Sequence, residues 1–259
     1  MRIAGCMEYD GTGFCGWQVQ HGQYTVQEAL ESAISHIADH RVQVHGAGRT
    51  DSGVHACGQI FHFDTDSARS EHSWVMGINS KLPKQASLLW VKVVPETFHA
   101  RFSAISRRYR YILLNRRARP GAMTGKTGWY PRALDVERMN GCAQNLLGEH
   151  DFSAFRSAQC SNKVTTKRIV AIDVKRCDDW VWIDVEATGF LHNMVRIIAG
   201  TLVEVGCGDR DSDWVCEVLA GKDRTKAGVT VPADGLYFVN VRYPLEFSLP
   251  APPAAFRFW

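Results

Sequence analysis

The pattern of apolar and polar residues divides the chain into two successive sets of strands and helices. Apolar residues from Val26 to Ile37 recur at helical spacing, and Thr25 with Glu28 three residues later forms a capping box, which predicts a helix start. A second helix is predicted around residues 74–78. Short runs of apolar or alternating residues predict strands at 2–10, 42–44, 59–63 and 88–94.

The pattern restarts after residue 103. In the run 107–115, Tyr109, Tyr111 and Leu113 alternate with Arg108 and Arg110, so the two groups are expected on opposite faces of a strand. Further strands are predicted at 169–175, 181–187 and 236–242, and helices at 191–205, 213–219 and 136–147, the last stopped by Gly148. Each half thus resembles β-α-β-β-α-β with antiparallel pairing.

We therefore predict an α+β protein built from two ferredoxin-like or RRM-like two-layer units, with mixed, mainly antiparallel sheets packed by helices. The predicted boundaries are an N-terminal domain at 1–103, a C-terminal domain at 104–245 and a proline-rich tail at 246–259 that runs as an extended strap or a loose end.

Composition agrees with a folded protein and excludes several classes. Of 259 residues, 45% are hydrophobic and 22% charged, as in globular domains and unlike disordered chains. No run of 18 apolar residues exists, and the N-terminus becomes acidic at Glu8 before a signal-like core develops, so we expect a cytoplasmic protein with no membrane segment. The eight cysteines lack C-x-x-C spacing and no H-E-x-x-H occurs, so we expect reduced thiols and no metal site.

The net charge of +3 hides a strong segregation of charge. Residues 97–134 hold nine Lys and Arg side chains and no acid, and residues 152–172 hold four more and again no acid. The rest of the chain is therefore acidic, with a net charge of −10. Such a distribution indicates a polyanion-binding surface; the alternative is that the arginines pair with distant acids in the fold.

Two glycine-rich segments are candidates for chemistry. Residues 11–16 spell G-x-G-x-x-G after a strand, but the predicted helix begins nine residues beyond Gly16 and bulky Trp17 intervenes. This spacing disfavours dinucleotide binding and favours a flexible loop that contacts RNA backbone. In the second segment, 46–56, glycines flank Arg49-Thr50-Asp51, so Asp51 is either an exposed nucleophile or base, or part of a polar turn between strands.

The second segment, GRTDSGVHA, resembles the signature loop of the tRNA pseudouridine synthase A family. The chain also resembles this family in EYDGTGFCGWQ, FHARFSAISRRYRY, LLGEHDFSAFR, FLHNMVRIIAGTLVEVG and GLYFVNV, which follow one another in family order up to the proline tail. The resemblance implies isomerisation of uridine to pseudouridine at positions 38, 39 and 40 of the tRNA anticodon stem-loop. It also implies a homodimer, an active-site cleft between the two units, and neither cofactor nor metal.

The resemblance implies a role for each matching residue. Asp51 matches the catalytic aspartate, and Arg49 matches the arginine that helps to extrude the target base. Tyr109 matches the aromatic residue that packs on the uracil, and Arg196 the basic partner of the aspartate, while Leu236 resembles an apolar residue beneath the base. Tyr111, on the same strand face as Tyr109, is interpreted as structural. The residues expected to contact the RNA backbone are Arg107, Arg108, Arg110, Lys163 and Arg168.

Other enzyme classes fit the sequence less well. A glycosidase needs a second carboxylate at a defined separation, which the Asp51 segment does not offer. A zinc deaminase needs H-x-E and P-C-x-x-C, which do not occur. The remaining alternative is a non-catalytic RNA-binding or folding-assistant protein on the same scaffold, and the presence of Asp51, Arg49 and Tyr109 together disfavours it.

Overall fold

The computed structural model describes residues 1–157 and 164–258. The chain folds into two compact units. Unit 1 contains Met1–Ile105 and Tyr237–Phe256, and unit 2 contains Ser106–Leu236 with the nearby Arg257 and Phe258. The break after residue 105 lies close to the expected boundary, whereas the last strand, expected in the second domain, lies in unit 1.

Unit 1 is a sheet in the order β4-β1-β3-β10, with the short β2 also paired to β3. The β1–β3 and β1–β4 pairs are antiparallel, and β10 joins β3 in parallel. Its elements are β1 (Arg2–Tyr9), α1 (Val26–Ala38), β2 (His45–Gly46), β3 (His55–Asp64), α2 (Glu71–Lys81), β4 (Ala86–Val94), β10 (Leu236–Arg242) and the short 3-10 turn η5 (Leu245–Phe247).

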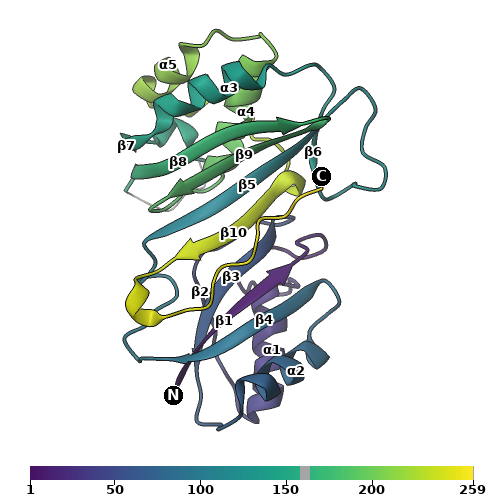
Figure 1. Ribbon diagram of the computed structural model, residues 1–259, viewed down its shortest axis with the longest axis vertical. Helices are drawn as coiled ribbons and strands as arrows, with labels where there is room; N and C mark the ends of the chain where they lie inside the picture. The colour runs from purple at the N-terminus through teal and green to yellow at the C-terminus, as the bar shows by residue number, and fades with distance from the viewer. Residues whose placement is uncertain (158–163, 259) are drawn as a thin grey trace. The chain divides into compact units, whose positions relative to one another are not determined.

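Helices α1 and α2 pack together against one face of this sheet (Figure 1). The predicted N-cap is confirmed, because the Thr25 hydroxyl accepts a hydrogen bond from the Glu28 backbone amide at 3.3 Å. The buried ring of Trp74 on α2 meets Phe63 of β3 edge to face, at 5.5 Å between ring centroids. The helices therefore cover the face of β3 that carries Phe63.

The strand predicted at 42–44 is wrong. This segment has no strand partner; instead, side chains of α1 bind its backbone. Ser35 accepts from the Val42 amide and Glu31 from the Val44 amide, both at 2.9 Å, while Gln27 donates to the Val44 carbonyl at 3.1 Å. The apolar pattern correctly indicated that Val42 and Val44 are buried. Their backbone groups, however, form hydrogen bonds with side chains of α1 instead of with a neighbouring strand.

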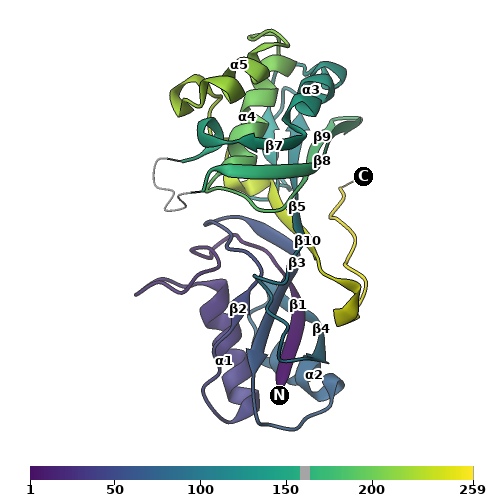
Figure 2. The same cartoon turned by 90° about the vertical axis from the view of Figure 1, so that its left-hand side faces the viewer.

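The opposite face of the unit 1 sheet is covered by the segment after β10, drawn in yellow. Figure 2 shows α1 on one side of the sheet and this segment on the other. Phe247 packs edge to face on Phe98 at 5.1 Å, and Phe256 stacks on Tyr237 at 5.6 Å. Gly58 has no room for a side chain, because a Cβ there would lie 2.8 Å from Pro253. The proline-rich segment thus lies against the sheet through several contacts.

In unit 2, β5, β9, β8 and β7 are antiparallel neighbours in that order, and β6 pairs in parallel with β5. Helices α3, α4 and α5 pack beside it and against one another (Figure 1). Its elements are β5 (Ser106–Asn115), β6 (Gly128–Tyr130), α3 (Val136–Ala143), η1 (Gln144–Leu146), β7 (Gly148–Asp151), η2 (Ser153–Phe155), β8 (Thr166–Cys177), β9 (Trp180–Ala187), α4 (Met194–Gly206), α5 (Trp214–Gly221), η3 (Arg224–Lys226) and η4 (Ala233–Gly235).

The helix predicted at 136–147 ends four residues early. After Ala143 the chain tightens into η1, where Gln144 donates to the Ile172 carbonyl of β8 at 3.1 Å. Gly148, expected as the helix stop, begins β7 at a φ of +95°, a conformation that glycine adopts without strain. The remaining predicted elements of unit 2 occur close to their expected bounds, and the predicted α+β class with mainly antiparallel sheets is confirmed.

Candidate functional site

The Asp51 loop lies between β2 and β3, and it is held by contacts that the two neighbours of Asp51, Thr50 and Ser52, make with residues earlier in the chain. The buried Thr50 is fixed twice: its hydroxyl pairs with the Tyr9 hydroxyl at 2.8 Å, and its carbonyl accepts from the Trp17 amide at 3.0 Å. On the other side, the Ser52 hydroxyl donates to the Phe14 carbonyl at 3.1 Å. The backbone on both sides of Asp51 is therefore fixed.

The loop is closed further by its own backbone and by β3. The Val54 backbone amide donates to the Asp51 carbonyl at 3.1 Å, and the side-chain amide of Gln59 on β3 donates to the Gly48 carbonyl at 2.8 Å. Asp51 itself is half-buried, and Arg49 is exposed. With the backbone held, the carboxylate of Asp51 moves only through its own side-chain torsions, which is the arrangement expected of a preorganised reacting group.

The first glycine-rich segment is the support of this loop. Gly16 has a φ of +82°, and a Cβ there would lie 2.7 Å from the Thr50 carbonyl oxygen. A Cβ on Gly11 would lie 2.1 Å from the Val54 carbonyl oxygen. These two glycines permit close contact with the Asp51 loop, so the expected flexible loop is instead packed at both ends. Gly13, between them, is exposed and has nothing within 4 Å of its Cβ position.

Residues that sequence reasoning missed complete this support. Tyr9 is 4% exposed, and burial raises the pKa of its hydroxyl, so it remains protonated at neutral pH. His55 receives the Gly11 amide on Nδ1 at 3.0 Å and stacks on Tyr237 at 4.7 Å. The only signal in the sequence was position: Tyr9 ends a strand directly before the glycines, and His55 follows the Asp51 segment.

The other predicted substrate-binding residues lie in unit 2. Tyr109 on β5 is 9% exposed and meets Phe190 edge to face at 4.9 Å. Tyr111 is fully buried and donates its hydroxyl to the Pro232 carbonyl at 2.9 Å, in agreement with a structural role. Leu236 is buried. The preceding residue, Gly235, packs so closely on β5 that a Cβ on it would lie 2.5 Å from the Ile112 carbonyl oxygen.

Arg196 is held at a fixed place on α4. It is half-buried, and its Nε donates to the Val231 carbonyl at 2.7 Å. Its Nη1 donates to the side-chain oxygen of Asn193 at 2.9 Å. Asn193 precedes the helix in a left-handed conformation with a φ of +62°. These contacts orient the guanidinium. Burial raises the pKa of the Tyr111 hydroxyl, and the positive charge of Arg196 offsets part of that rise.

The predicted RNA-backbone residues differ strongly in exposure. Arg110 is 5% exposed and pairs with Asp184, its cross-strand neighbour, through two hydrogen bonds of 2.9 and 2.7 Å. The half-exposed Arg108 contacts the same carboxylate at 2.9 Å. Internal pairing, the alternative raised from the sequence, therefore holds for Arg110, whose guanidinium has almost no surface left for a phosphate.

The remaining members are more accessible. Arg107 is half-exposed and donates to the Thr188 carbonyl at 3.2 Å, and Arg168 on β8 is exposed. Lys163 lies outside the described residues. Two further arginines of the acid-free stretch pair at the surface, Arg116 with Asp179 at 3.8 Å and Arg132 with Asp209 at 2.7 Å.

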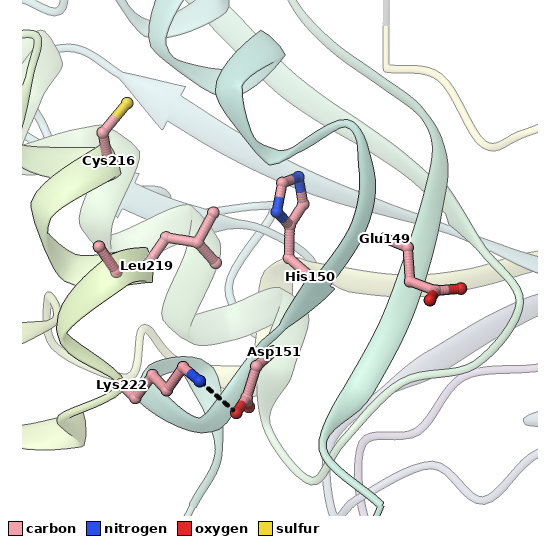
Figure 3. Close-up of a pocket in the computed structure, with 7 residues that line it drawn as sticks. Glu149, His150, Asp151, Cys216, Leu219 and Lys222 are labelled. Carbon is pink, nitrogen blue, oxygen red and sulfur yellow. Dashed lines mark ion pairs between the residues drawn. The ribbon is translucent and has the colours of Figure 1, made fainter.

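A pocket of about 410 Å³ lies between β7 and α5, and none of the described candidate residues lines it (Figure 3). Within it Lys222 pairs with Asp151 at 3.3 Å, and Glu149 points away from the other labelled side chains. Hydrogen bonds from Ser153, followed by those from Thr165 and Lys222, lower the pKa of Asp151. Within 1–157 and 164–258, no cluster of His, Cys, Asp and Glu side chains is arranged to hold a metal ion.

Comparison with known proteins defines the class to which this fold and this loop belong. The family model of tRNA pseudouridine synthases matches residues 6–103 and 142–244. The chain therefore belongs to the tRNA pseudouridine synthase family, whose members are isomerases that act on tRNA. Among the described residues, no helix is both long and apolar enough to cross a membrane.

Individual relatives share this similarity over almost their whole length. The chain is 50% identical over 252 residues to tRNA pseudouridine synthase A of Coxiella burnetii, covering 97% of each chain. It is 50% identical over 250 residues to the protein of the same name from Thiobacillus denitrificans, covering 96% of each. With the protein of that name from Hydrogenovibrio crunogenus, identity is 48% over 244 residues, covering 94% of this chain and 93% of the relative. The family resemblance seen in the sequence is confirmed.

Proposed function

We propose that this protein converts uridine to pseudouridine at positions 38, 39 and 40 of the tRNA anticodon stem-loop, with Asp51 as the catalytic carboxylate and no cofactor. The observation that carries the proposal is the loop in which both neighbours of Asp51 are fixed, Thr50 by Tyr9 and Trp17 and Ser52 by Phe14. Membership of the family supplies the reaction class.

The reaction requires one carboxylate and no external electrons. The N-glycosidic bond between N1 and C1′ of the target breaks, the uracil turns, and a bond forms between C5 and C1′. The C5 proton leaves to solvent or to a base and N1 takes up a proton, so the product is an isomer of uridine. Asp51 starts this sequence by one of three routes: addition to C6 of the uracil, attack on C1′ of the ribose, or removal of a ribose proton so that uracil leaves by elimination. Each route uses an ionised carboxylate held close to its target atom.

The base must leave the helix before Asp51 reaches it. Extrusion of a nucleotide costs a few kcal/mol. We assign its compensation to Arg49, whose exposed planar cation fills the vacated space. Tyr109 packs on the extruded uracil and Leu236 lies beneath it. Arg196 is assigned the role of cationic partner of the Asp51 carboxylate, since a nearby cation favours the charged form of a carboxylate.

RNA is gripped by basic residues that position it without reading its sequence. Arg107, Arg108 and Arg168 are proposed as phosphate contacts, with Lys163 as a further one. Arg110 is assigned a different role: it orients Asp184, which in turn holds Arg108 at the surface. The functional assembly is proposed to be a cytoplasmic homodimer in which one tRNA contacts both subunits.

The proposal is tested with purified protein and three anticodon stem-loop RNAs, each carrying a single uridine at position 38, 39 or 40. Carbodiimide treatment followed by primer extension detects pseudouridine in each. The wild-type protein is expected to modify all three, and Asp51→Ala none, while its affinity for the RNA stays within about threefold. Turnover by Asp51→Ala would exclude Asp51 as the reacting group. The Ser52→Ala variant removes one contact that fixes the loop but keeps the Asp51 carboxylate. It therefore measures how much turnover is lost through disturbance of the loop alone.

A further inference from the structure

A ring of solvent-exposed aromatic and cationic side chains lies in unit 1 at some distance from the Asp51 loop. Phe102 is 75% exposed. The His99 ring lies 4.3 Å from the Phe102 ring, between centroids, and the Arg101 guanidinium carbon lies 5.6 Å above the same ring. His45 extends the cluster: its ring lies 5.7 Å from His99, and it is exposed. We call these four side chains the Phe102 cluster.

Phe102 is exposed although the loop that carries it is firmly anchored. Arg2 donates to the Phe98 carbonyl at 2.9 Å, Tyr243 donates to the Ala100 carbonyl at 2.6 Å, and the buried His62 accepts from the Ala100 amide at 3.2 Å. The loop therefore holds the Phe102 ring at a fixed place in solvent. A phenyl ring held in water by its surroundings forgoes the free energy of its burial, and its face is available for contact with a ligand.

The imidazole of His99 is also fixed in orientation. Its Nδ1 accepts from the amides of Arg101 and Phe102 at 3.1 and 3.3 Å. Its backbone amide donates to the Ser103 hydroxyl at 2.9 Å. Burial, followed by the charge of His45, lowers the pKa of His99, so the ring is neutral at pH 7. The cluster thus presents a neutral imidazole, a phenyl ring and a guanidinium, three planar groups on which nucleobases stack.

The charge of the surroundings favours a polyanion over a protein partner. The loop opens the acid-free stretch 97–134. The nearest acid on β3, Asp64, is neutralised by two hydrogen bonds from Arg2 at 2.9 and 2.8 Å. An aromatic ring with a cation above it combines stacking with attraction to phosphate, as in surfaces that bind unpaired nucleotides.

The pairing of the strands gives the distance from the cluster to the catalytic loop. His45 on β2 lies opposite His62, whereas Tyr9, which binds Thr50, lies opposite Ala56. Six residues of β3 separate these positions, which is about 20 Å along the strand. A nucleotide on the cluster is therefore not the target uridine.

We propose that the Phe102 cluster is a stacking platform for one unpaired nucleotide of the tRNA, about 20 Å from Asp51. The inference rests on the proposed function, since it takes the same tRNA as its ligand. Stacking of a base on one aromatic ring changes affinity by roughly 5- to 150-fold. The platform therefore contributes to substrate affinity and has no part in bond cleavage.

The test measures tRNA affinity and the single-turnover rate at saturating tRNA for four variants of the full chain. Phe102→Ala is expected to weaken affinity by about tenfold and to leave the saturated rate within twofold of wild type. Phe102→Trp keeps a stacking ring and should bind like wild type. Phe102→Leu keeps apolar bulk without a ring and should behave like Phe102→Ala. Leu245→Ala, at a residue that is 94% exposed, is the matched control and should change neither value.

Three results would overturn the inference. Unchanged affinity in Phe102→Ala excludes the platform. Full affinity in Phe102→Leu indicates an apolar contact without stacking. A changed oligomeric state of Phe102→Ala, measured by light scattering after gel filtration, assigns the cluster to contact with a second copy of the chain. Failure of the proposed function is distinguishable from all three, because the wild-type protein itself would then leave positions 38–40 unmodified.

Discussion

The packing of Gly16 against the Asp51 loop predicts that a single methyl group will impair the reaction. In Gly16→Ala the new Cβ would lie 2.7 Å from the Thr50 carbonyl oxygen, and the residue would have to keep a φ of +82°. The left-handed backbone costs alanine roughly 1–2 kcal/mol. Overpacking against backbone that cannot turn away adds about 1–3 kcal/mol, and relief of the contact moves Thr50, and with it Asp51, by several tenths of an ångström.

Gly13→Ala is a control that separates these two costs. Gly13 has a φ of +86°, almost that of Gly16, but a Cβ there would have nothing within 4 Å. Gly13→Ala therefore has the strain of the left-handed backbone but no steric overlap. Its free energy of unfolding should fall by roughly 1–2 kcal/mol, and its turnover should be normal. Because a 1 Å misplacement of a reacting group can cost about a hundredfold in rate, Gly16→Ala should turn over at least about tenfold more slowly.

The assay combines urea unfolding with the single-turnover rate at saturating tRNA, at a temperature where both variants are folded. Gly16→Ala should be less stable than Gly13→Ala by about 1–3 kcal/mol and slower by about tenfold or more. Equal rates for the two variants would refute the reasoning, because they would show that contact between the two loops does not position Asp51.

Four further predictions follow from other contacts. Tyr9→Phe and Thr50→Val each remove one partner of a buried hydroxyl pair, so each should cost about 1–2 kcal/mol, and the double variant should cost less than the sum when unfolding is measured as a double-mutant cycle. Arg107→Ala should lower the slope of log affinity for tRNA against log salt by about one; an unchanged slope would show that Arg107 meets no phosphate. Arg110→Met should leave that slope unchanged but destabilise the fold by about 3 kcal/mol or more, because Asp184 would lose its buried partner. His62 is 1% exposed, and burial, followed by the charges of His99 and Arg2, lowers its pKa to about 3. Below about pH 6.5 the unfolded chain binds a proton at this residue that the folded chain does not, so the free energy of unfolding should fall by about 2 kcal/mol between pH 7 and pH 5. Urea unfolding at the two pH values measures this fall, and His62→Gln should remove it.

Local rules predicted the elements whose stabilising contacts are themselves local. The capping box at Thr25 and Glu28 marks the start of α1, and the alternating residues of 107–115 mark β5. The turn between β8 and β9 falls at Asp178, which takes a positive φ of 51° as short polar turn residues do. In each case the sequence signal lies within a few neighbouring positions, although β5 itself is held by pairing with the distant strand β9.

The errors arise where distant parts of the chain decide. Residues 42–44 have the composition of a strand, but Glu31 and Ser35 of α1 bind their amides. The last strand was expected in the second domain, yet it joins β3 of unit 1 through the pairing of Tyr237 with His55. No local pattern contains such a choice of partner, because a strand can pair with any sheet edge that matches its burial.

The candidate site shows the same division. The Arg49-Thr50-Asp51 segment was conspicuous in the sequence, whereas its support was not. The contact between Tyr9 and Thr50 spans 41 residues, and that between Phe14 and Ser52 spans 38. Likewise, Arg110 looked like a surface cation until Asp184, 74 residues away, was found opposite it. Arginine composition alone does not distinguish a phosphate contact from a buried ion pair.

The central claim is that Asp51 of this chain makes pseudouridine at the three anticodon positions. Its most direct test is the modification state of uridines 38, 39 and 40 in tRNA from cells that lack the protein, measured by mass spectrometry, with wild-type or Asp51→Ala chain returned at equal levels. The account predicts that these uridines are unmodified without the protein, are modified again with the wild-type chain, and stay unmodified with Asp51→Ala. The account would be contradicted if Asp51→Ala restored pseudouridine at these positions, or if cells that lack the protein still contained it there.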